Sequence, residues 1–210
     1  MWWIISFLHY FAFTCDDYSF VHITFTILFS SWLKAGFVRK LKSRPKYVSP
    51  LSVDCRKVKK RLCLDCTVIN ENLIKENTKL PSLKLSESLV APNDYAKIMD
   101  MENAYFHVQI CRYDWDKLCF AIPTENDPDQ YEFYSFKVMI YRISTATAVL
   151  NLLTKPLIDF ALTLNIKVTL YIDDLRITCC FQYKLEVQST TIKQIFNMAG
   201  FMLNLGKRII

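Results

Sequence analysis

Two adjacent aspartates, Asp173 and Asp174, stand between two short runs rich in β-branched and aromatic residues. These runs, residues 167–172 and 175–181, predict a β-hairpin with both carboxylates at its tip. Like charges repel, more so when buried, so a chain keeps such a pair at the end of buried strands mainly where a cation binds. Ligands that are all oxygen favour Mg²⁺ or Mn²⁺. The alternative is a polar turn, in which Asp is common.

A third carboxylate, that of Asp100, ends a predicted strand over residues 95–100. Three carboxylates from two separate strands meet the needs of two-metal phosphoryl transfer. One ion lowers the pKa of an attacking 3′-hydroxyl, and the other holds the triphosphate and stabilises the leaving pyrophosphate. The spacing therefore predicts a nucleotidyl-transfer site, provided that Asp100 meets Asp173 and Asp174 in one pocket.

The elements that must position these groups follow from the hydrophobic periodicity and from the turn residues. Ser144 is expected to cap a helix, and Pro156 to bend or divide it. Residues 70–77 and 124–130 are expected to be polar connections. The predicted strands are 61–66, 95–100, 106–110, 117–122, 131–138 and 201–205, and the predicted helices are 82–91, 144–165 and 185–199, the last ending at Gly200. We therefore expect an α/β (α+β) fold.

The positive charge of the chain is concentrated in one block. The whole sequence of 210 residues has a net charge of +6, whereas residues 34–61 carry eleven Lys and Arg against Asp54 alone, a net +10. Such a block suits contact with a polyanion such as nucleic acid. A solvated face with no partner is the alternative.

The eight cysteines include one CxxC pair, Cys63 and Cys66, and no second pair follows at the spacing of a zinc site. Within a strand these two side chains would point to opposite faces, so they could not grip one metal. We interpret all eight as small hydrophobic residues in a reducing compartment, which favours the cytoplasm or the nucleus.

Residues 1–33 form an apolar leader, divided by Asp16 and Asp17 into halves too short to span a bilayer. We expect this leader to lie outside the domain core, or to form a helix that covers part of the domain. The alternative is a membrane anchor that Lys34, Arg39 and Lys40 flank on the cytoplasmic side.

Six blocks, in one order, resemble the reverse transcriptase domain of gypsy-like and DIRS-like retrotransposons. The resemblance covers residues 34–210, which leaves the leader outside the domain. The blocks are YVSPLSV from Tyr47, KRLCLD from Lys60 with Asn70, DMENAYFHV from Asp100, STA from Ser144 with Pro156, YIDD from Tyr171, and AGFMLN from Ala199 with Lys207.

The resemblance implies an RNA-directed DNA polymerase that uses two Mg²⁺ or Mn²⁺ ions, dNTPs, and an RNA or DNA template with its primer. It implies a palm of antiparallel strands backed by helices, and a partial fingers subdomain over residues 36–92 and 112–140. No thumb is matched, so a second chain or other retroelement domains are expected to supply thumb and RNase H.

The resemblance also assigns residues in the palm. Asp100, Asp173 and Asp174 match the ligands of the two metal ions. Tyr105 matches the aromatic residue that stacks under the deoxyribose and excludes a 2′-hydroxyl, and Asn103 and Ala104 lie in the same motif, against the triphosphate. Lys207 matches a lysine near the pyrophosphate, and Tyr171 is expected to touch the primer end.

In the fingers, Arg61 matches the arginine that lies over the base and the α-phosphate, and Tyr141 and Arg142 lie in a nucleotide-pocket motif. The neighbouring basic residues Lys57, Lys59 and Lys60 are expected to face primer and template.

The sequence departs from the family at Arg142, where the family has a glycine that lets the backbone approach the nucleotide. An arginine would either block that pocket or swing out to bind phosphate. The first alternative predicts that catalytic activity is lost, and the second that it is kept. Glu102-Asn103 also replaces the usual Lys-Asp. Three hypotheses result: a polymerase domain, a non-catalytic nucleic-acid-binding remnant of one, and a small membrane-anchored protein.

Overall fold

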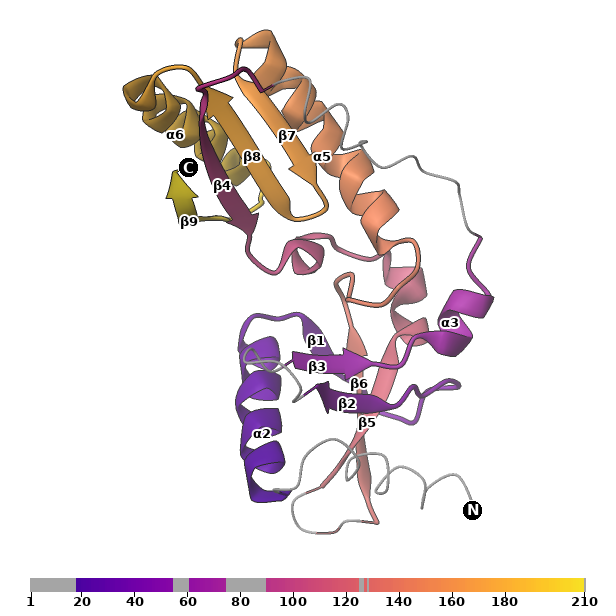
Figure 1. The fold of residues 1–210 in the computed structure, drawn as a ribbon. Coiled ribbons are helices and arrows are strands. Elements are labelled where there is room, and N and C mark those ends of the chain that lie inside the picture. Colours follow the sequence, from indigo (N-terminus) through magenta and orange to yellow (C-terminus); the bar gives the residue numbers. More distant parts are fainter. Residues whose placement is uncertain (1–17, 55–60, 75–89, 125–126, 128, 210) are drawn as a thin grey trace. The chain divides into compact units, whose positions relative to one another are not determined.

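The computed structural model describes residues 18–54, 61–74, 90–124, 127 and 129–209, and Figure 1 shows their fold. The chain divides into two compact units. Unit 1 comprises residues 1–73 and 109–144, and unit 2 comprises residues 74–108 and 145–210. The chain therefore crosses from one unit to the other three times, after Leu73, Val108 and Ser144.

Unit 1 contains two small antiparallel sheets. In the first sheet β6 (Tyr131–Phe136) is the central strand, with β1 (Val38–Lys40) and β5 (Cys119–Pro123) on either side. The second sheet pairs β2 (Leu51–Asp54) with β3 (Arg61–Leu64). The short helix α3 (Thr67–Glu71) follows β3, and the 3₁₀ helix η2 (Arg112–Lys117) precedes β5.

An aromatic cluster joins helix α2 (Tyr18–Lys34) to the sheets of unit 1. The ring of Phe29 meets Tyr134 edge-on, with the ring centroids 4.9 Å apart, and Trp32 meets Phe136 in the same way at 5.0 Å. Trp32 is buried. Residues 18–34 thus form a covering helix, the second of the two expectations for the apolar leader, and residues 1–17 lie outside the described part. No described helix is long and apolar enough to cross a bilayer.

Unit 2 is built on one four-stranded antiparallel sheet with the strand order β7-β8-β4-β9. The predicted hairpin is present as β7 (Lys167–Tyr171) and β8 (Asp174–Cys179). The central strand β4 (Tyr95–Met101) pairs with β8 on one side and with β9 (Leu203–Ile209) on the other. A strand from early in the chain therefore lies between two strands from its end.

Two helices pack on this sheet, α5 (Ala146–Thr163) against β7 and α6 (Gln182–Met198) against β8 and β4. The buried residues of each helix lie on one stripe at the helical period and are mostly apolar, with Thr154, Gln188 and Ser189 as the polar members. Helix α6 ends as predicted at Gly200, whose φ of +88° forms a left-handed cap with Phe201 N–H donating to Phe196 O over 2.9 Å. The principal core residues are Met99, Leu150, Ala161, Leu175, Ile177, Leu185, Ile192 and Phe196.

The mixed fold of helices and antiparallel strands agrees with the predicted α/β (α+β) class, but three local predictions were wrong. Residues 106–110 are not a strand: the 3₁₀ helix η1 (Ala104–His107) begins after Asn103, whose φ is +47°. Thr145, not Ser144, occupies the N-cap of α5. Of the two effects predicted for Pro156, a bend or a division of the helix, the division does not occur. Residues 70 and 71, expected to begin a polar connection, belong to helix α3 instead. The predicted helix over residues 82–91 lies almost entirely outside the described residues.

The cysteines divide by burial, so the interpretation of all eight as small hydrophobic residues was wrong for two of them. Cys63, Cys66, Cys119 and Cys179 are buried, whereas Cys111 and Cys180 are exposed. All six of these described cysteines are free thiols. Burial raises the pKa of the Cys66 thiol to about 11, which keeps it protonated at neutral pH.

Candidate active site

The hairpin tip carries the two adjacent aspartates in different positions. Tyr171 and Asp174 form the last cross-strand pair, so the loop consists of Ile172 and Asp173 alone. Ile172 has a φ of +60° and Asp173 has no positive φ, which is the pattern of a type II′ turn, normally occupied by glycine at its first position. The positive φ of a β-branched residue at this position raises the free energy of the folded chain by about 1–2 kcal/mol. The sheet around it fixes this turn.

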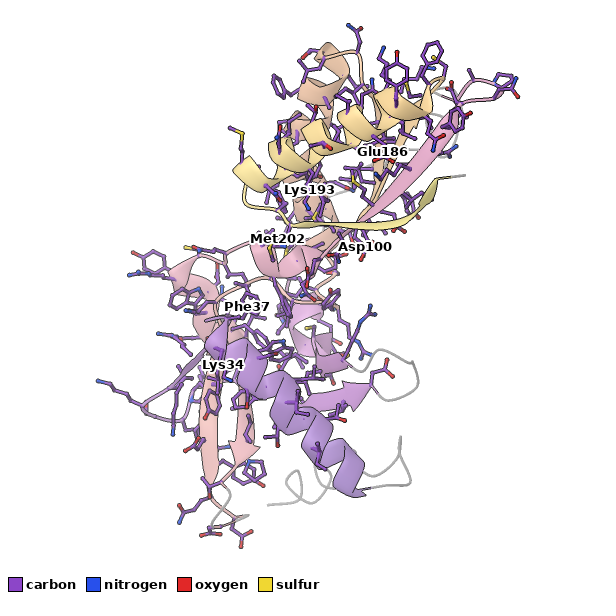
Figure 2. All side chains as sticks on the ribbon, turned by 90° about the vertical axis from the view of Figure 1, so that its left-hand side faces the viewer. Lys34, Phe37, Asp100, Glu186, Lys193 and Met202 are labelled. Atoms are coloured by element: carbon purple, nitrogen blue, oxygen red, sulfur yellow. The ribbon has the colours of Figure 1, made fainter. Side chains whose placement is uncertain are left out.

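Asp100 lies directly opposite Asp174 in the β4–β8 pair. The backbone continues the contact, because Met101 N–H donates to Asp173 O over 2.9 Å. Residues directly opposite each other in an antiparallel pair project to the same face, with Cβ atoms about 4.5–5.5 Å apart. Two of the three predicted carboxylates are therefore neighbours in space, although 74 positions separate them in the sequence. Figure 2 shows Asp100 on its strand.

These two carboxylates project from the sheet face that does not carry the core. Met99, Met101 and Leu175 alternate with them and are buried, so the carboxylates point the other way. On their face, one row of side chains crosses all four strands, since each member is the register partner of the next. The row is Tyr171, Asp174, Asp100 and Asn204.

The two central residues of the row, Asp174 and Asp100, offer only oxygen atoms as metal ligands. Asp174 and Asn204 are exposed and Asp100 is half-buried. Within the described residues no basic side chain forms an ion pair with Asp100 or Asp174. A hard divalent cation fits such a pair. No three His, Cys, Asp or Glu side chains among the described residues are grouped closely enough to hold a metal, so Asp173 is not brought into one cluster with the pair.

The residues after β4 hold an aromatic side chain in place. Tyr105 is half-buried in η1, and its hydroxyl lies 3.0 Å from the Thr147 hydroxyl in the first turn of α5. Ala104, the residue before it, is buried. The His107 ring is tied to Glu102 O over 2.7 Å, which closes the turn that begins at the left-handed Asn103. The sequence prediction did not include Thr147, since nothing in its local pattern marks it as a partner of Tyr105.

A second group of predicted residues lies in unit 1. The Arg61 guanidinium, at the start of β3, lies over the ring of Tyr141, 5.6 Å from its centroid. Arg142 is exposed and has a φ of +75°, a left-handed conformation that glycine adopts most readily. Its charge lies within electrostatic reach of Asp65, whose pKa is lowered mainly by hydrogen bonds from Thr67 and least by Arg142.

The remaining predicted residues have less structure around them. Tyr171 is half-exposed at the end of β7. The backbone of Lys207 lies in β9 opposite Ile98. Lys57, Lys59 and Lys60 lie outside the described residues.

The fold and the row of carboxylates define a class, a mixed α/β protein whose acidic residues lie at a hairpin tip and on the strand beside it. The model of one protein family, described as Reverse transcriptase (RNA-dependent DNA polymerase), matches residues 33–209. Because the match covers most of the chain, the protein belongs to the reverse transcriptase family. A search of curated proteins finds no match to the chain.

Proposed function

We propose that the chain is the RNA-directed DNA polymerase domain of a gypsy-like or DIRS-like retrotransposon, with unit 2 as its palm and unit 1 as its fingers. The single observation that carries this proposal is the register of Asp100 opposite Asp174, beside a hairpin whose turn is held in a strained conformation. A polar turn without function would have no need of a second carboxylate directly opposite on the next strand.

In the proposed reaction the facing carboxylates of Asp100 and Asp174 would hold the divalent ions, whereas Asp173 lies outside their cluster. Bound Mg²⁺ or Mn²⁺ would lower the pKa of the primer 3′-hydroxyl and neutralise charge on the leaving pyrophosphate. The hard ion follows from the oxygen donors of the facing pair.

The other residues bind and orient the two substrates. Tyr105, fixed by Thr147, stacks on the deoxyribose and rejects a 2′-hydroxyl, while Asn103 and Ala104 offer their backbone to the triphosphate. Tyr171, at the end of the acidic row, touches the primer terminus. The proposed phosphate-binding cations are Arg61, Arg142 and Lys207, and the proposed primer and template contacts are Lys57, Lys59 and Lys60.

Primer extension tests the proposal. The full chain is incubated with primed poly(rA), dTTP and Mn²⁺, and extension is expected from the wild-type chain but not from D174N or D100N. D159N is the matched control, because Asp159 is an exposed carboxylate on α5 that pairs only with Lys155 among the described residues. Extension that survives in D174N would refute the assigned site, and no extension by the wild type would refute the activity.

A second candidate, a nucleic-acid-binding remnant without catalysis, is favoured by one observation. Lys42, Arg44 and Lys46 are exposed in a segment that has no carboxylate between Asp17 and Asp54. The aromatic ring of Tyr47, itself half-exposed, lies under the Lys46 ammonium at 5.2 Å. Template binding that falls steeply with salt, without extension by the wild type, would support this candidate over the polymerase.

A further inference from the structure

The side chain of Asn70 bridges two backbone positions of a loop more than seventy residues further along the chain. Asn70 lies on α3, and its Nδ2 donates to Arg142 O over 2.8 Å. Ser144 N–H donates to the Oδ1 of the same carboxamide, also over 2.8 Å. All three residues belong to unit 1.

A carboxamide is the side-chain group that fits both positions. It offers one donor and one acceptor in the same plane, so it can pair with a C=O and an N–H that are two residues apart. A carboxylate could accept from Ser144 but could not donate to Arg142, and a hydroxyl could not reach both positions at once. The two bonds hold the loop on each side of Ile143.

The loop needs such support because its backbone is unfavourable. Arg142 has a φ of +75°, and a non-glycine residue with that φ persists only where the surroundings fix it. The two hydrogen bonds of the Asn70 carboxamide, here called the clamp, include one to the carbonyl of Arg142 itself. Its side chain is exposed, so the clamp fixes the Arg142 backbone and leaves the guanidinium free to meet a ligand.

Two further contacts from the β3–α3 segment reach the same loop. The Arg61 guanidinium covers the Tyr141 ring, and the Cys66 thiol donates weakly to Tyr141 O over 3.9 Å. Helix α3 is itself anchored, because Asp65 accepts from both the N–H and the hydroxyl of Thr67. The start of the helix that carries Asn70 is thus fixed by side-chain hydrogen bonds.

We propose that Asn70 is a positioning residue for nucleotide binding, which sets the backbone of residues 141–144 so that Tyr141 and Arg142 meet the incoming dNTP. This inference rests on the proposed function for the identity of the ligand. The clamp itself rests only on the hydrogen bonds of unit 1.

The experiment compares N70A and N70D with N72A in the full chain. Asn72 is the matched control, because it is an exposed asparagine at the end of the same helix whose Nδ2 donates to Val68 O and to no loop residue among those described. Hydrogen exchange at the Ser144 amide reports the clamp, and exchange at the Phe136 amide, which donates to Leu118 O, reports the rest of unit 1. Binding of a fluorescent dTTP analogue in the presence of Mn²⁺ reports the nucleotide role.

N70A is expected to speed exchange at Ser144 about tenfold or more while Phe136 is unchanged, because two ordinary hydrogen bonds are lost locally. It is expected to weaken dTTP binding to a similar degree. N70D is expected to protect Ser144 better than N70A, since it keeps an acceptor, and yet to bind dTTP poorly, since it places an oxygen against Arg142 O. N72A is expected to match the wild type in both measurements.

Unchanged exchange at Ser144 in N70A would overturn the clamp. Faster exchange with undiminished dTTP binding would overturn the positioning role. If the wild-type chain itself binds no dTTP, the proposed function fails and the nucleotide role of Asn70 fails with it, whereas exchange at Ser144 still decides whether the clamp exists.

Discussion

At the scale of single residues, the proposed metal-binding role of Asp100 and Asp174 predicts that stability depends on the metal ion. Like charges directly opposite each other across two strands oppose folding, and D100N removes that repulsion. In EDTA we therefore expect D100N to be more stable than the wild type by up to about 1 kcal/mol. Added Mn²⁺ is expected to raise the thermal midpoint of the wild type and not that of D100N, since a ligand stabilises only a state that binds it.

Differential scanning fluorimetry with a Mn²⁺ titration measures both effects. The control is D159N, which removes an exposed carboxylate on α5 and is expected to keep the metal response. Equal midpoint gains from Mn²⁺ in D100N and the wild type would place the metal elsewhere in the chain.

Arg142 has a positive φ, which is unfavourable for a residue with a side chain. A positive φ raises the folded-state free energy of a residue with a side chain by about 1–2 kcal/mol. Glycine removes this strain, but its greater backbone freedom in the unfolded chain cancels part of the gain in stability. R142G is therefore expected to stabilise the chain by about 0.5–1 kcal/mol in urea unfolding. R44G, at an exposed arginine without a positive φ, is expected to give no gain, and a gain of the same size there would show that φ is not the cause.

At the scale of elements, α3 depends on the hydrogen bonds at its start. Hydrogen bonds from Thr67 lower the pKa of the Asp65 carboxyl, with a smaller contribution from the charge of Arg142. A group whose folded pKa is depressed adds stability above its unfolded pKa of about 3.9 and loses it as the pH falls through the folded value.

We therefore expect D65N to lower the urea midpoint relative to the wild type at pH 7, and the difference to shrink by pH 3. T67V, which removes the hydroxyl donor that lowers this pKa most, is expected to behave in the same way. A difference between D65N and the wild type that is constant over this pH range would contradict the assigned cause.

The elements differ in how far the sequence could predict them. The β7–β8 hairpin, the helix stop at Gly200 and the class of fold follow from local patterns of period and turn residues. The strand predicted over residues 106–110 failed because the left-handed backbone at Asn103 starts a 3₁₀ turn, which the alternation of Phe106 and Val108 does not reveal. Ser144 resembles a helix cap, but its N–H is bound by Asn70, a partner far away in sequence.

The candidate site divides in the same way. Residue types and order indicated the three aspartates, Tyr105 and Arg142, whereas the register that sets Asp100 against Asp174 is a property of the folded sheet. Asn204 and Asn70 lie in the sequence motifs that resemble the family, but their neighbours in space, Asp100 and the loop at Arg142, are known only from the fold. No pattern within a few residues of Asn70 could have predicted a hydrogen bond to residue 142.

At the scale of the whole molecule, the uneven charge gives a quantitative prediction for nucleic-acid binding. Each phosphate contact on a single strand contributes about 0.7 to the slope of log K against log salt. The triple variant K42Q/R44Q/K46Q is therefore expected to reduce this slope by about 2 units on a single-stranded RNA oligonucleotide. The control K155Q/K184Q/K193Q removes the same charge from α5 and α6 and is expected to leave the slope nearly unchanged.

Fluorescence anisotropy over a range of salt concentrations measures the slope. A full slope in the triple variant would show that the segment over residues 42–46 is a solvated face. An equal reduction in both triple variants would show that total charge, and not its location, controls binding.

The position of β4 between β8 and β9 also governs the order in which the chain can fold as it leaves the ribosome. All of unit 1 has been made once Ser144 is added, whereas the Asp100 strand has neither sheet partner until residues 174–209 follow. At about 5–20 residues per second, β4 waits roughly 4–15 s for β8. During translation Asp100 is therefore synthesised long before its sheet partners, and unit 2 is the last part of the described chain to be assembled.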